Sequence, residues 1–125
     1  MRDKVIAILD KWAISYHPTG SRYICNPAPT DTDEDIVCLA TEELKLALEY
    51  AGAEADGEPE KYEGMSDFVS MRMGEVNVIV TDAPSFYRRF VAATEEAKAK
   101  NLVSKADRIA LFQSRLYGAG EEIPL

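Results

Sequence analysis

The sequence predicts an α+β domain in which helices pack on a small mixed β-sheet. Two observations support this class. Apolar or alternating runs over 35–39, 68–73 and 76–80 are typical of strands. Segments with apolar residues at helical spacing lie before, between and after those runs. With 125 residues, the chain suits one domain, so residues 1–125 are expected to share one fold.

The first predicted element is an amphipathic helix over 3–14, followed by a loop. Its apolar residues recur at helical spacing: Val5, Ile8, Leu9 and Trp12. Pro18 and Gly20 end this pattern and predict the loop. Two prolines exclude regular structure over 26–30, because each lacks a donor and restricts the residue before it.

A buried strand over 35–39 comes next, and then a second helix. Thr41 is a candidate N-cap for this helix, which is predicted over 42–52. The stretch from Gly52 to Gly64 is acidic and rich in glycine and proline. It therefore predicts a surface loop.

The strands 68–73 and 76–80 are predicted to form a hairpin around Gly74. A helix follows, with Asp82 as its candidate cap and Pro84 in its first turn.

The last predicted helix begins after Ser104, because residues 104–107 have the form of a capping box. Gly118 is a plausible stop for it. Trp12 and the Phe and Tyr residues are core candidates.

The composition excludes several classes of function. A net charge of −8 argues against broad, sequence-independent binding of nucleic acid, although a local basic patch stays compatible with it. The N-terminus does not read as a signal peptide, and no apolar run is long enough for a membrane span. Cys25 and Cys38 show no zinc spacing, and Cys38 lies in an apolar run, so we expect a cytoplasmic protein without disulfides.

Two short motifs carry the candidate chemistry. Asp33 and Asp35 are two residues apart at the start of a strand, so their side chains share a face with Cα atoms ~7 Å apart. Clustered carboxylates call for a cation, and hard oxygen ligands suit Mg²⁺. Before them, the Gly20-Ser21 turn can bring backbone N–H groups and a hydroxyl close to phosphate oxygens.

Together these motifs resemble the signature of the DNA polymerase β-like nucleotidyltransferase superfamily. Residues 76–82 and 108–113 also look like small nucleotidyltransferase-like proteins of tailed phages. The resemblance implies that Asp33 and Asp35 are catalytic and bind Mg²⁺. It also implies that a nucleoside triphosphate contacts Gly20, Ser21 and Arg22.

The superfamily takes a third acid from a neighbouring strand, and here this chain differs. Asn77 stands at the corresponding place on strand 76–80. The carbonyl of Asn77 can coordinate a metal but brings no charge. The side chain of Glu75 is expected on the same face of the strand and could take its place. Asp82 is more suited to capping a helix.

Each of these residues also has a plainer interpretation. Gly20-Ser21 alone is usually a turn, and Asp33-Glu34-Asp35 alone is usually a solvated acidic turn. His17 either contacts phosphate or is a loop histidine with no special role. Arg22 either contacts phosphate or pairs with the acidic loop. The basic residues of the last two helices form either solvated faces or a rim for the triphosphate.

Three functional hypotheses follow. The first is a Mg²⁺-dependent enzyme that transfers a nucleoside monophosphate to a hydroxyl and releases pyrophosphate. Its acceptor is open between protein, RNA and a small molecule, and a homodimer or partner protein would supply the acceptor surface. The second is a catalytically degenerate relative, a phage-encoded binding or inhibitor protein acting on a host factor in the host cytoplasm. The third is an acidic interaction domain without a nucleotide site.

Overall fold

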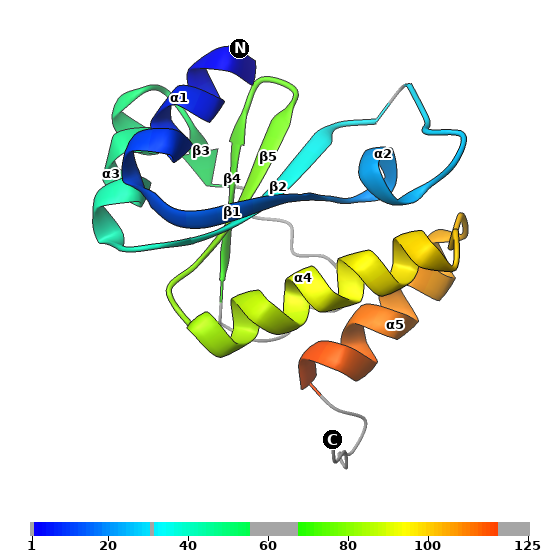
Figure 1. Cartoon of the computed structure of the whole chain (residues 1–125). Helices are drawn as coiled ribbons and strands as arrows, with labels where there is room; N and C mark the ends of the chain where they lie inside the picture. Colours follow the sequence, from blue (N-terminus) through cyan, green and yellow to red (C-terminus); the bar gives the residue numbers. More distant parts are fainter. Residues whose placement is uncertain (1, 31, 56–67, 118–125) are drawn as a thin grey trace.

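The computed structural model describes residues 2–30, 32–55 and 68–117, and it confirms the α+β class. Five strands form one mixed sheet, with helices on both faces (Figure 1). The helices are α1 (Arg2–Trp12), α2 (Ser21–Ile24), α3 (Glu42–Tyr50), α4 (Pro84–Ala99) and α5 (Lys105–Tyr117). The strands are β1 (Ala13–Thr19), β2 (Glu34–Ala40), β3 (Glu54–Ala55), β4 (Val69–Met73) and β5 (Val76–Thr81).

The strand order across the sheet is β1-β2-β5-β4-β3. The two central strands, β2 and β5, are parallel, and every other neighbouring pair is antiparallel. The predicted hairpin around Gly74 is confirmed as β4 and β5. It lies directly beside β2, which carries Asp35.

The sheet separates two apolar clusters, because alternate residues of a strand point to opposite faces. On one face, α1 and α3 pack against the sheet through Val5, Leu9, Leu44 and Leu48. On the other face, α4 and α5 pack through Phe86, Phe90, Phe112 and Leu116. Cys38 lies in the first cluster, as predicted, and burial raises the pKa of its thiol to about 12.

The N-terminal segment differs from the prediction. The first helix ends at Trp12, and residues 13–19, expected partly as helix and partly as loop, form β1. This strand lies at the edge of the sheet, where proline is tolerated because no second neighbour needs its N–H. Pro18 therefore does not end the structure. Trp12 and Tyr50, both core candidates, are 40% and 97% exposed, so these two assignments were wrong.

Smaller differences concern caps and loops. Ala83, not Asp82, is the N-cap of α4. Thr41 is the N-cap of α3 as predicted, but its hydroxyl donates to Glu43 and not to the helix backbone. Ser104 accepts from the backbone N–H of Asp107 at 3.4 Å, as the capping box predicts.

The region predicted as a loop from Gly52 contains β3, and α2 was not expected. The remainder of that loop and Gly118 lie outside the described residues. Among the residues that are described, no helix is long and apolar enough to cross a membrane.

Candidate functional site

A pocket of about 310 Å³ lies on the sheet face that α4 and α5 cover. Its floor is the sheet, one wall is the turn into α2, and the opposite wall is the N-terminal part of α5. The two motifs found in the sequence meet here, because Gly20, Ser21, Asp33 and Asp35 all line it.

A row of polar residues crosses the floor of the pocket at one level of the sheet. Thr19 on β1 is paired with Asp35 on β2, Asp35 with Asn77 on β5, and Asn77 with Arg72 on β4. All four residues line the pocket. Four strands therefore place a hydroxyl, a carboxylate, an amide and a guanidinium side by side.

Gly20 brings the backbone unusually close to Asp35. A Cβ built on Gly20 would lie 2.1 Å from Oδ2 of Asp35, and the glycine has φ +79°. Both observations require glycine at this position. In this structure the close approach is made by the Asp35 carboxylate, which occupies the space beside the turn.

The Asp33 carboxylate already has a positively charged side chain as its partner. It forms an ion pair with Arg72, and each of the two side chains is 42% exposed. The sequence pattern predicts two carboxylates without a basic partner, so this ion pair differs from the expectation. The pairing of β4 with β5 places Arg72 beside Asn77, on the side away from Asp35.

Asn77 takes the place expected for the third metal ligand, beside Asp35. Its Nδ2 donates to Oδ1 of Asp35 at 3.2 Å. Its Oδ1 is buried and has no hydrogen-bond partner among the described residues. A buried carbonyl oxygen left in this state carries a desolvation cost that a ligand or cation in the pocket would remove. Glu75 is exposed and does not line the pocket.

The two residues after Gly20 are placed differently. The Ser21 hydroxyl faces the pocket and donates to Thr32 Oγ1 over 3.4 Å. Arg22 donates to the backbone carbonyl of Thr32 at 3.2 Å and is not part of the pocket lining. Arg22 thus stabilises the connection between α2 and β2.

One wall of the pocket is basic. Of the basic residues on the last two helices, Lys105 and Arg108 line it. The Arg108 guanidinium also donates to the carbonyls of Leu102 and Val103, at 3.0 and 2.9 Å. Its position is therefore fixed by the turn between α4 and α5. Together with Arg72, these residues surround an acidic floor with positive charge, an arrangement that suits an anion carrying a divalent cation.

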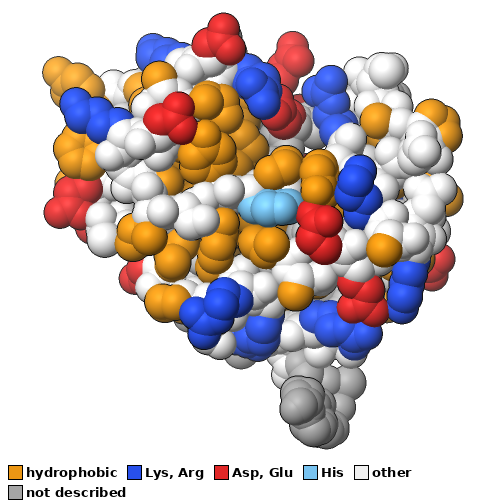
Figure 2. Space-filling view, in the orientation of Figure 1, with side chains coloured by type: hydrophobic (Ala, Val, Ile, Leu, Met, Phe, Trp, Pro, Cys, Tyr) orange, Lys and Arg blue, Asp and Glu red, His pale blue; other side chains and the backbone are white. Residues whose placement is uncertain are grey.

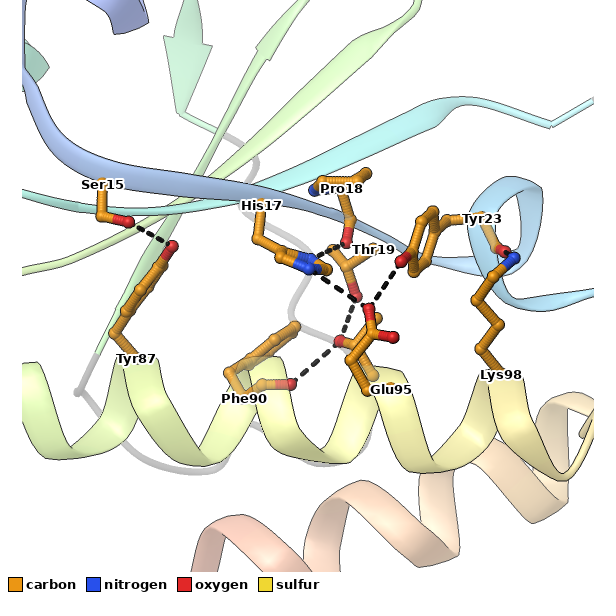
Figure 3. A network of polar contacts seen from close by, with 10 residues as sticks. Ser15, His17, Pro18, Thr19, Tyr23, Tyr87, Phe90, Glu95 and Lys98 are labelled. Atoms are coloured by element: carbon orange, nitrogen blue, oxygen red, sulfur yellow. Dashed lines mark hydrogen bonds and ion pairs between the residues drawn. The ribbon is translucent and has the colours of Figure 1, made fainter.

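His17 lies on β1 and not in a loop, and it does not line the pocket. Three polar contacts join β1 to α4 (Figure 3): Ser15 with Tyr87, His17 with Glu95, and Thr19 with Thr94. The Thr94 hydroxyl donates to the Phe90 carbonyl, so the buried Thr19 hydroxyl must be the donor to Thr94. These contacts fix the position of β1, the strand that ends directly before Gly20.

The donor set of the pocket fits one hard divalent cation. Asp33, Asp35 and the carbonyl of Asn77 are oxygen ligands, which Mg²⁺ prefers, and Mg²⁺ commonly takes its remaining ligands from phosphate and water. Within the described part of the chain, no group of three His, Cys, Asp or Glu residues is arranged to hold a metal. Two carboxylates and one amide oxygen are therefore the candidate protein ligands in this pocket.

Comparison with known proteins finds no family model, no curated protein and no solved structure that matches this chain. The geometry of the pocket and the resemblance of its two motifs are therefore the basis for assigning a function.

Proposed function

We propose that this protein binds a Mg²⁺-bound nucleoside triphosphate in the pocket and transfers its nucleoside monophosphate to a hydroxyl group. The observation that carries the proposal is the row of Asp35 and Asn77 on neighbouring parallel strands, with Gly20 against the same carboxylate. This arrangement brings the oxygen atoms of Asp35 and Asn77 and the glycine turn into one pocket, as the two sequence motifs require.

In this proposal each residue has a defined task. Asp35 and Asp33 hold the cation with their carboxylates. Asn77, whose Nδ2 donates to Asp35 in the metal-free protein, turns its orphan Oδ1 to the cation. The Ser21 hydroxyl and the backbone at Gly20 contact the β- and γ-phosphates. Lys105 and Arg108 offset the negative charge of the triphosphate.

The reaction is an in-line displacement. The acceptor hydroxyl oxygen forms a bond to the α-phosphorus, and the bond from that phosphorus to the bridging oxygen breaks. The hydroxyl proton leaves to a carboxylate or water, and pyrophosphate departs with the electron pair. When bound, Mg²⁺ would neutralise phosphate charge and lower the barrier to this transfer.

The decisive experiment is thermal unfolding with each of the four ribonucleoside triphosphates, with and without Mg²⁺. A ligand present at about 100 times its Kd should stabilise the protein by ~2.7 kcal/mol. We expect this effect to need Mg²⁺ and to disappear in Asp35→Asn, which keeps the acceptor for Asn77. Asp82→Asn is the matched control, because Asp82 is exposed and outside the pocket lining. The absence of stabilisation by any triphosphate in wild type would refute the proposal.

A second candidate function is favoured by the ion pair between Asp33 and Arg72. If Arg72 permanently neutralises Asp33, the pocket binds a nucleotide without transferring it, and the protein acts as a binding or inhibitor protein. Incubation with a triphosphate labelled at the α-phosphate separates the two functions. Release of pyrophosphate and labelling of an acceptor indicate the enzyme, whereas Mg²⁺-dependent binding without either indicates the binder.

A further inference from the structure

A second surface lies on the opposite face of the sheet, where α1 and α3 pack side by side (Figure 1). Each helix turns one stripe toward the core and a second stripe outward. The outward stripe of α1 consists of Lys4, Ala7, Ile8, Lys11 and Trp12. The outward stripe of α3 consists of Glu43, Leu46, Ala47 and Tyr50. Both follow helical spacing, and together they line an open groove of about 750 Å³, here called the α1/α3 groove.

The α1/α3 groove exposes large apolar side chains. Tyr50 is 97% exposed, Leu46 is 56% exposed and Trp12 is 40% exposed. Hydrophobic side chains gather over this part of the molecule among Lys, Asp and Glu side chains (Figure 2). Small alanines between the aromatic residues leave room for side chains from outside. Aromatic side chains in such a setting are typical anchors of protein interfaces.

One end of the groove carries opposite charges on its two sides. Lys4 and Lys11 lie on the α1 side of the groove, and Glu43 lies on its α3 side. The helices run in opposite directions, because Ala13 after α1 pairs with Ala40 before α3. Lys11 and Glu43 are therefore at the same end of the groove.

We propose that the α1/α3 groove is the interface of a homodimer whose two-fold axis runs along the groove. Such an axis places α1 of one copy opposite α3 of the other and leaves each residue at the same position along the length of the groove. Lys11 then meets Glu43 of the second copy, and Lys4 meets Tyr50 of the second copy. The apolar stripes close over each other, and both nucleotide pockets stay open on the outer faces.

The size of the surface sets the expected affinity. The helices have 11 and 9 residues, which makes them about 16 and about 13 Å long. They cover less than the ~800 Å² per partner of a standard interface. We therefore expect a reversible dimer with a dissociation constant in the micromolar range.

Sedimentation velocity on the full chain, from about 5 to about 500 μM, tests this interface over the range expected for its size. Wild type should pass from monomer to dimer across this range. Tyr50→Lys and Leu46→Lys should each raise the dissociation constant by at least ~10-fold, because they place charge in an apolar interface. Val103→Lys is the matched control, since Val103 is 61% exposed and lies outside the groove.

A charge reversal tests the stated orientation. Lys11→Glu and Glu43→Lys should each weaken the dimer, and the double variant should recover most of the loss. Circular dichroism confirms that each variant is folded. A double variant that stays as weak as the single ones overturns the two-fold axis along the groove.

Two results would overturn the whole proposal. Wild type that stays monomeric at the highest concentration shows that the groove is not a homodimer interface. A wild-type dimer that survives Tyr50→Lys and Leu46→Lys forms through another face. Neither result bears on triphosphate binding, because the pocket lies across the sheet from the groove.

Discussion

The carboxylate of Asp35 lies where a side chain on Gly20 would have to begin. A Cβ at position 20 would be 2.1 Å from Oδ2 and 2.9 Å from Cβ of Asp35. The turn and the first residues of β2 are consequently one unit, and neither can change without the other.

Gly20→Ala should destabilise the protein by ~1–3 kcal/mol in urea unfolding, because it adds a clash to a positive φ. Gly52→Ala is the control for backbone strain alone. Gly52 also has a positive φ, of 108°, but nothing lies within 4 Å of its added Cβ. Introducing Asp35→Ala should recover part of the loss from Gly20→Ala and none of the loss from Gly52→Ala. Equal losses in both glycine variants, without recovery, would show that the contact with Asp35 is unimportant.

Arg72→Met should increase the Mg²⁺ affinity of the triphosphate complex, because the cation no longer competes with Arg72 for Asp33. The stability of the free protein should change by less than ~1 kcal/mol, as both partners are well exposed. Isothermal titration with Mg²⁺ at fixed triphosphate measures the effect, with Arg88→Met on the exposed side of α4 as the control. Weaker Mg²⁺ binding in Arg72→Met would instead assign Arg72 to the phosphates.

Asn77→Asp should have opposite effects with and without metal. It places a second carboxylate against Asp35, so the metal-free protein should lose stability. With Mg²⁺ and triphosphate, the added charge should strengthen metal binding and raise any nucleotidyl transfer. Thermal unfolding with and without Mg²⁺ measures the first effect, and pyrophosphate release measures the second. A rapid wild-type reaction that slows in Asn77→Asp would identify the amide as a working ligand and would exclude the degenerate binder.

The ion pairs of Glu96 should make stability depend on pH in the acid range. Hydrogen bonds from Arg115 and then Lys100 lower the pKa of Glu96 to about 2. Because the folded-state pKa lies below the ordinary value of 4.5, the contribution is complete above about pH 4.5 and is lost as the pH falls toward about 2. Urea unfolding of wild type and Glu96→Gln should therefore differ most near neutral pH and converge near about pH 2. In an Arg115→Gln background, the same substitution should produce a much smaller pH-dependent difference.

Local patterns predicted the central part of the fold. Strand 35–39, the hairpin around Gly74 and the helices after it depend on alternation, turn chemistry and capping, which are visible within short segments. The same alternation placed Val76, Val78 and Val80 on a core face and Asn77 toward the site, and the structure agrees.

Features that depend on pairing between distant segments could not be predicted in this way. β1 has no strong strand pattern and exists because β2 pairs with it. The ion pair between Arg72 and Asp33 needs the register of β4, β5 and β2 together. His17 was predicted in a loop because Pro18 and Gly20 follow it, and its contact with Glu95 joins two segments that are far apart in the sequence.

Pro18 has a consequence for how molecules of this protein meet at high concentration. It sits in an edge strand and offers no N–H to an incoming strand, while β3, at the other end of the sheet, has two residues within the described part of the chain. Sheet edges of this kind disfavour the strand-by-strand growth that leads to amyloid-like fibrils. The native protein should therefore resist fibrillation even where its outer helices bring copies together.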